Sequence, residues 1–356
     1  MLNNSKLLAG IATVVAIVSA TGVFAADGKG ALYGDIRWSL DYADDKTATV
    51  GPTYTATDNN SFWGVKGAMT QGGITAFGAY ERFLDADENV SVDIVRQAYA
   101  GLKCDVLGTL KYGEFESDYY QAGRKVDLFY NTTVAGIGGV SAGRLLLGAG
   151  NSHGQSFLNG NGNPGVIGGG IFNNQVAYTS PSFFGVTVNA AAIIDEGVTS
   201  GVPTQDHDYA LGAEFNQGGI SFGVQAIDAN SGNLGLGPDE DAVRVYGGFS
   251  AKNFGAHASA ERLDFNNNGG ADDQYYYASG WFGILPGTRL AASVGSENET
   301  GAEGDSVTLG VFHDVIENFT TWVAARRFDG KNQQGGIVND VVTIGASYKF
   351  DMGFGR

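Results

Sequence analysis

Apolar and polar side chains alternate along most of this chain. The first clear stretch, Ala31 to Tyr42, has an apolar face made of Leu32, Ile36, Trp38, Leu40 and Tyr42. The opposite face is polar and carries Tyr33, Asp35, Arg37, Ser39 and Asp41. A period of two predicts a β-strand with one apolar side. One such strand fits a soluble sandwich as well as a membrane barrel, because either would carry the same stripe.

Similar segments recur through the rest of the chain. They are Ser61–Gln71, Gly73–Leu84, Val92–Cys104, Gly108–Phe115, Phe172–Ser180, Phe184–Asp195, His207–Asn216, Gly219–Asp228, Asp241–Ala251, Phe254–Phe265, Asp273–Leu285, Thr288–Glu297, Gly304–Asp314, Phe319–Phe328 and Asp340–Phe350. With the first, they give about sixteen strands, an even number in the range of bacterial outer-membrane barrels.

The connections between these segments alternate in length. Short ones, such as Gly72-Gly73 and Pro286-Gly287, follow long polar ones, such as 43–60 and 116–171. Tight turns at one rim and long loops at the other are typical of an up-and-down barrel, and closure removes the open edges that lipid does not tolerate. We therefore predict an all-β fold: a transmembrane antiparallel up-and-down β-barrel of 16 strands.

The N-terminal segment has the pattern of an export signal. Lys6 precedes the apolar run Leu7 to Val18, and Val23-Phe24-Ala25 is a small-x-small cleavage site, so we predict a signal peptide over residues 1–25. The chain of 356 residues has a formal net charge of −17 and no basic cluster, which argues against nucleic acid as a partner.

Four segments resemble the general-diffusion porins of Gram-negative outer membranes. They are Ala31–Gly34, Arg96–Lys103, Ala177–Gly185 and Val342–Phe350. The resemblance implies an outer-membrane homotrimer of sixteen-stranded barrels, each narrowed by a long third loop folded into the lumen. It also implies passive diffusion of small hydrophilic solutes and ions. The expected partners are other copies of the chain, outer-membrane lipid and lipopolysaccharide, and the outer-membrane assembly machinery.

The chain departs from the family pattern at three places. Where relatives tend to carry wall cations, this sequence has Asp35, Phe62 and Ile171, and the loop 116–171 is long and glycine-rich. Porins commonly end on a phenylalanine, whereas here six residues follow Phe350. We therefore expect the barrel to span residues 26–350 and residues 351–356 to form a short C-terminal extension.

Charged residues near the third loop are the candidates for the pore constriction. Strict alternation places Arg96 with Ala98 and Ala100, opposite Gln97 and Tyr99, and we assign Arg96 to the lumen. The candidate wall cations are Arg37, Lys66 and Arg96, and the candidate loop anions are Glu114, Glu116, Asp118 and Asp127. Opposite charges across the water-filled gap would create a transverse field. From the net charge, we expect the pore to prefer cations.

One polar stretch has partial calcium-loop spacing. Asp264, Asn266, Asn268 and Asp272 follow the spacing, but Tyr275 stands where the closing glutamate of an EF-hand belongs. An ordinary polar loop rich in asparagine and glycine accounts equally well for this sequence. We expect no cofactor, with Ca²⁺ or Mg²⁺ at the extracellular loops as an alternative that EDTA treatment tests.

Enzymatic motifs are not supported. Gly139 to Gly143 fits G-x-S-x-G by letter but lacks the strand–turn–helix context, and the four histidines are scattered. We therefore expect a channel rather than an enzyme. The alternatives are an exported β-rich surface adhesin or structural protein, a substrate-specific porin, and a barrel phospholipase. Heat-modifiable migration on SDS gels separates the barrels from the soluble adhesin.

Overall fold

The computed structural model describes residues 27–46, 51–84, 95–130, 132–134, 171–194, 198–199, 202–203, 207–229, 240–265, 273–299, 302–332 and 335–355. The N-terminal part of the wall consists of β1 (Asp27–Asp45), β2 (Thr53–Asp58), β3 (Phe62–Gln71), β4 (Ile74–Phe83), β5 (Val95–Cys104), β6 (Gly108–Glu116), β7 (Ile171–Thr179) and β8 (Val186–Ile193). The C-terminal part consists of β11 (Asp208–Gln217), β12 (Ile220–Ala229), β13 (Glu240–Ser250), β14 (Phe254–Phe265), β15 (Asp273–Leu285), β16 (Thr288–Glu299), β17 (Ala302–Ile316), β18 (Phe319–Asn332) and β19 (Gly335–Gly355).

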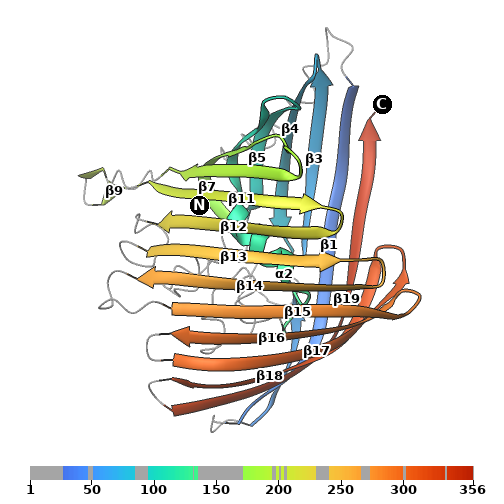
Figure 1. Cartoon of the computed structure of the whole chain (residues 1–356). Coiled ribbons are helices and arrows are strands. Elements are labelled where there is room, and N and C mark those ends of the chain that lie inside the picture. Colours follow the sequence, from blue (N-terminus) through green and yellow to red (C-terminus); the bar gives the residue numbers. More distant parts are fainter. Residues whose placement is uncertain are drawn as a thin grey trace.

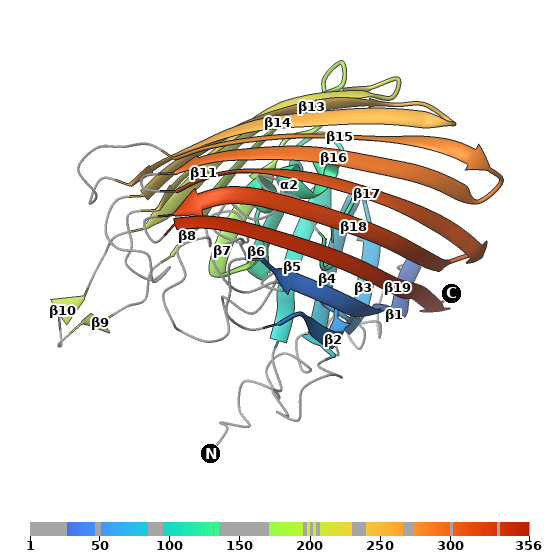
Figure 2. The same ribbon diagram turned by 90° about the horizontal axis from the view of Figure 1, so that it is seen from below.

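These strands form one closed antiparallel barrel (Figures 1 and 2). Each strand pairs with its neighbour in the chain, and β1 pairs with β19 to close the ring. The second half of β1 pairs with β2 and its first half with β3, so β2 and β3 together act as one strand of the wall. Counted this way, the barrel has 16 strands, as the sequence predicts.

In this barrel the apolar side chains of the wall face outward and the polar ones face inward, the reverse of a soluble protein. On β1, the apolar Trp38 and Leu40 are 56% and 64% exposed, whereas the polar Ser39 and Asp41 between them are 4% and 5% exposed. A water-soluble sandwich would bury the apolar side chains. An apolar outer band around a polar interior is the arrangement of a barrel in lipid, so the structure supports the membrane barrel over the soluble adhesin.

Glycine shapes the short turns at one rim. Gly72 and Gly73 have φ values of 58° and 80°, and this left-handed backbone joins β3 to β4 in a two-residue hairpin. Residues with a Cβ rarely adopt this backbone conformation. The twist of such a turn matches the twist of the two strands that it connects. The sequence-predicted asymmetry between short and long connections follows from such turns.

The end of the chain differs from the sequence-based expectation. The last strand, β19, runs on to Gly355, and Asp351 to Gly355 pair with Lys29 to Tyr33 of β1. These residues are therefore part of the wall, rather than an extension that begins after Phe350.

Three further elements lie in segments for which the sequence predicts only loops. They are β2, the helix α2 (Asp118–Val126), and a small hairpin of β9 (Val198–Thr199) and β10 (Val202–Pro203). No helix within the described ranges is long and apolar enough to cross a membrane.

Candidate functional site: the lumen and its inner segment

Residues 117–130 and 132–134, which follow β6, lie inside the barrel (Figure 2). Ser117 caps α2 by accepting a hydrogen bond from the backbone N–H of Tyr120 at 3.1 Å. The helix contacts β11 to β15, on the wall opposite the strand from which it emerges (Figure 2). This segment is the first part of the predicted third loop; residues 135–170 lie outside the described ranges.

The first turn of α2 is held by a buried ion pair on the wall. Arg244 and Glu261 have fully buried side chains and pair at 2.9 Å. Arg244 also donates to the carbonyl oxygen of Tyr119 at 3.0 Å, and the Tyr119 hydroxyl donates to Glu261. Burial, with the nearby Glu261 carboxylate, raises the pKa of Tyr119 well above its usual value, so this hydroxyl stays a donor.

A second group of contacts holds the end of the helix. The Tyr277 hydroxyl donates to Asp127 at 2.7 Å, and the Ser279 hydroxyl donates to the carbonyl oxygen of Val126 at 2.5 Å. Phe129 then packs on Phe312, with ring centroids 5.7 Å apart, inside an apolar cluster on the inner wall. The inner segment is thus fixed to the wall by both polar and apolar contacts.

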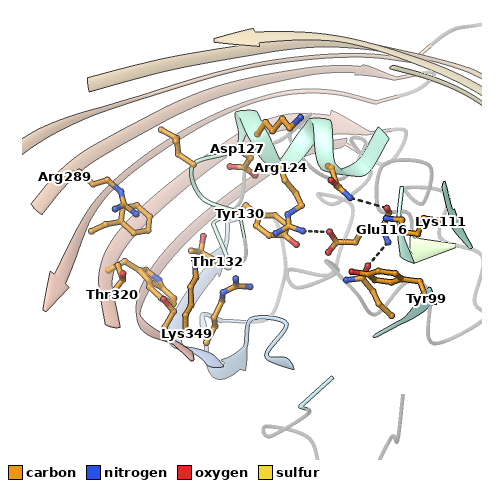
Figure 3. Close-up of a pocket in the computed structure, with 18 residues that line it drawn as sticks. Tyr99, Lys111, Glu116, Arg124, Asp127, Tyr130, Thr132, Arg289, Thr320 and Lys349 are labelled. Carbon is orange, nitrogen blue, oxygen red and sulfur yellow. Dashed lines mark hydrogen bonds and ion pairs between the residues drawn. The ribbon is translucent and has the colours of Figure 1, made fainter. Parts of the chain in front are cut away.

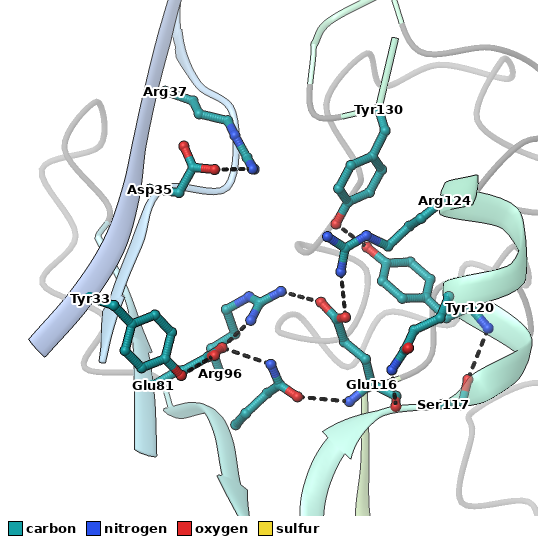
Figure 4. Close-up of polar contacts among 12 residues, drawn as sticks. Tyr33, Asp35, Arg37, Glu81, Arg96, Glu116, Ser117, Tyr120, Arg124 and Tyr130 are labelled. Carbon is teal, nitrogen blue, oxygen red and sulfur yellow. Dashed lines mark hydrogen bonds and ion pairs between the residues drawn. The ribbon is translucent and has the colours of Figure 1, made fainter. Parts of the chain in front are cut away.

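A charged network joins β4, β5 and the inner segment (Figure 4). Arg96 bridges Glu81 on β4 and Glu116 at the end of β6. The second oxygen of Glu116 accepts from Arg124 of α2. Tyr33 donates to Glu81 at 2.5 Å. Carboxylates with two such partners are well satisfied although they are buried.

A β-bulge explains how Arg96 reaches this network. Glu81 pairs with Gln97 and Arg82 pairs with Val95, so Arg96 is the extra residue of the bulge and has no partner in the β4–β5 register. Gln97 also points inward and donates to Glu81 at 2.7 Å. In a regular strand, Arg96 would share the outer face with Ala98; the bulge turns two adjacent side chains to the same side.

A water-accessible cavity of about 710 Å³ separates the inner segment from the wall (Figure 3). Its charged lining residues are Arg37, Lys111, Glu116, Arg124, Lys125, Asp127, Arg289 and Lys349. Cations therefore outnumber acids in the described part of the lining. The remaining lining is mixed and includes hydroxyls and aromatic rings.

The structure places three of the predicted constriction residues at this cavity: Arg37, Glu116 and Asp127. Arg37 pairs with Asp35 of the same strand. Arg96 lies behind Glu116 and is 7% exposed. The predicted residues are thus divided between the surface of the passage and the layer behind it.

The other three predicted residues lie outside the cavity lining. Lys66 pairs with Asp351 at 2.5 Å near the rim of the short turns. Glu114 pairs with Ala98 in the β5–β6 register. Asp118 begins α2, and burial raises the pKa of its carboxyl, an effect that Lys111 opposes.

Sequence reasoning missed five lining cations: Lys111, Arg124, Lys125, Arg289 and Lys349. Strand alternation could have found Arg289, because it shares a face with Ala291 and Ser293, and Lys349, because it shares a face with Ser347. Arg124 and Lys125 lie on a helix for which the sequence gives no strand-like signal, so their place inside the barrel was not predictable from alternation.

The proposed metal-binding loop is not tested by the structure. Asn266, Asn268 and Asp272 lie outside the described residues, as does the side chain of Asp264. Within the described ranges, no group of three or more His, Cys, Asp or Glu residues is arranged to hold a metal ion.

Comparisons with known proteins give consistent results. A family profile described as Gram-negative porin matches residues 12–333. No curated protein sequence matches. Among solved structures, the anion-selective porin from Comamonas acidovorans is similar, with a TM-score of 0.73 and 16% identity over 91% of this chain and 100% of that one. The outer membrane channel DcaP of Acinetobacter baumannii is also similar, with a TM-score of 0.62 and 13% identity over 91% and 98%.

Proposed function

The chain belongs to the Gram-negative porin family, and from this premise we propose that its lumen is a passive diffusion path for small hydrophilic solutes that favours anions over cations. The protein is an outer-membrane channel. Family and fold indicate a channel rather than an enzyme.

The anion preference rests on one observation: in three ion pairs of the lumen, the cationic side chain is more exposed than its acidic partner. These pairs are Arg37 and Asp35 at 12% and 5% exposure, Arg124 and Glu116 at 32% and 7%, and Lys125 and Glu214 at 43% and 15%. A passing ion therefore meets the positive member of each pair first. Selectivity depends on the charges that line the narrow part of a pore.

This proposal replaces the cation preference expected from net charge. Charges at the surface loops are screened over about 8–10 Å at physiological salt, so distant acids have little influence on the constriction. The proposal also replaces the transverse field, because the described inner segment and the facing wall both present cations. The anion-selective porin from Comamonas acidovorans has a similar fold, which is in line with the proposal but is no evidence of the same selectivity at 16% identity.

Zero-current potentials across a planar bilayer under a KCl gradient test the proposal. The wild-type channel is expected to give the sign of chloride preference, and Arg124→Gln is expected to move the potential toward zero. Arg327→Gln is the matched control, because Arg327 pairs with Val307 on the outer face of the wall. A wild-type potential with the sign of potassium preference would contradict the proposal.

Assembly as a homotrimer is a further part of the proposal and rests on the family resemblance. Contacts with lipopolysaccharide and the assembly machinery rest on the same resemblance, whereas divalent cations at the outer loops rest on the partial calcium-loop spacing of Asp264, Asn266, Asn268 and Asp272. Native mass spectrometry of the detergent-extracted protein tests the trimer. A melting temperature that EDTA leaves unchanged would argue against the divalent cations.

A further inference from the structure

Arg289 on β16 lies between two cavities. It lines the constriction cavity described above and also a second cavity of about 480 Å³ next to the short turns. The second cavity is lined by residues that include Lys252, Trp281, Leu285, Pro286 and Asp314. A solute that leaves the constriction toward this rim therefore passes Arg289.

The Arg289 guanidinium has unused hydrogen-bonding capacity. Its central carbon lies 4.9 Å from the ring centroid of Phe312, and the carboxylate of Asp314 is 3.9 Å away, beyond normal hydrogen-bonding distance. The Arg289 side chain is 39% exposed. Guanidinium has five N–H donors in a planar fork that matches a carboxylate. By contrast, Arg124 is hydrogen-bonded to Glu116.

The second cavity combines an excess of cationic groups with apolar surface. Lys252 supplies a second positive charge and Asp314, 48% exposed, a negative one, and the indole of Trp281, with Leu285 and Pro286, supplies apolar surface. Small-molecule sites usually occupy about 300–1,000 Å³, and this cavity falls in that range. The volume, with Arg289 and Lys252 near the indole of Trp281, suits a small molecule with an anionic head and a short apolar body.

We propose that Arg289 and the second cavity form a binding subsite for organic carboxylates, with the carboxylate on Arg289 and the apolar body against Trp281. The subsite rests on the proposed anion preference and refines it to a solute class. Arginine on an aromatic ring keeps its N–H edge free for a ligand, so the Phe312 contact positions the head group. The apolar surface then favours benzoate-like solutes over acetate.

Block of chloride current in single channels tests this subsite. The probes are benzoate, acetate and the neutral benzyl alcohol, each added at the rim of the short turns. Benzoate is expected to block at lower concentration than acetate, and benzyl alcohol is expected not to block. Equal block by benzoate and acetate would overturn the role of the apolar surface.

Two variants separate the head from the body of the ligand. Arg289→Gln is expected to raise the half-blocking concentration of benzoate about fivefold, the order for one exposed charge contact, and Arg289→Lys to restore part of the block. Trp281→Ala is expected to weaken block by benzoate but not by acetate. Lys103→Gln is the matched control, because Lys103 shares the inner face with Lys111 but lines neither cavity.

The experiment distinguishes failure of the subsite from failure of the proposed function. If wild-type channels prefer anions but Arg289→Gln leaves benzoate block unchanged, only the subsite is refuted. If wild-type channels prefer cations, the anion preference is refuted, and the subsite with it. All variants are first checked for heat-modifiable migration, so that a misfolded barrel is not read as a loss of binding.

Discussion

Replacing Glu261 with alanine is expected to free the first turn of α2 while the barrel stays folded. Glu261 pairs with the fully buried Arg244 at 2.9 Å and accepts a hydrogen bond from Tyr119. Removing one partner of a buried ion pair costs about 3–5 kcal/mol. The Tyr119 hydroxyl also loses its acceptor, which costs about 1–3 kcal/mol more.

Of the contacts that remain, the hydrogen bond from Arg244 to the Tyr119 carbonyl oxygen is at the first turn, and the others described above hold the far end of the helix. The hydrogen bonds from Tyr277 to Asp127 and from Ser279 to Val126 contribute about 1 kcal/mol each, and burial of the Phe129 side chain contributes about 1.5–3 kcal/mol. The loss at the first turn, about 4–8 kcal/mol, is therefore similar to or larger than these contributions, about 3.5–5 kcal/mol. We expect residues near 129 to stay in place and the start of α2 to move away from the wall.

Single-channel recording measures the consequence. Glu261→Ala is expected to increase mean conductance and open-channel noise, because the helix that narrows the lumen is no longer fixed at its start. Changing both Arg244 and Glu261 to methionine removes the unpaired charge and is expected to give intermediate noise, since the hydrogen bonds to Tyr119 are still lost. Arg327→Ala is the control, because its pairing with Asp340 is long and exposed.

A negative result would be clear. If Glu261→Ala gives heat-modifiable channels with wild-type conductance and noise, the buried pair is not what positions α2. The position of the inner segment would then depend on the apolar cluster around Phe129, and substitutions there would be the next test.

Two other predictions follow from the wall. Gly345→Ala is expected to lower the temperature at which the barrel loses its unboiled gel mobility, because a Cβ there would lie 2.2 Å from Cζ2 of Trp322 and 2.5 Å from the backbone oxygen of Trp38, and overpacking costs about 1–3 kcal/mol; an unchanged temperature would contradict this overpacking. A chain that ends at Phe350 is also expected to melt earlier, because Asp351 to Gly355 no longer pair with β1, whereas removal of Arg356 alone serves as the control and should have no effect.

The sequence predicts the wall well, because each strand is a regular pattern. Trp38 and Ser39, for example, are apolar and polar in sequence and are exposed and buried in the structure, as alternation predicts. Arg96 shows where this reasoning fails: its inward direction depends on a register shift of one residue, which alternation does not contain. The last strand fails for another reason. Met352 and Phe354 continue the outward apolar stripe at 55% and 53% exposure, but the family pattern, in which porins commonly end on a phenylalanine, places the boundary at Phe350.

The interior of the barrel is harder to predict because it depends on contacts between distant segments. Tyr119 and Glu261 are 142 residues apart in the chain, and Tyr277 and Asp127 are 150 apart. Nothing local to α2 indicates which wall it will contact. Its partners could be inferred only after the barrel had been built.

The charge presented to a solute also depends on side-chain length. Arginine and lysine extend further than aspartate and glutamate, so the cation of a wall pair can reach past its acid into the water. Arg124 and Glu116 illustrate this at 32% and 7% exposure. A neutral pair can therefore present a positive surface, and a chain with a net charge of −17 can have a passage that favours anions. Exchanging the residues of one such pair would keep the net charge while reversing the sign of the exposed end, which separates this effect from total charge.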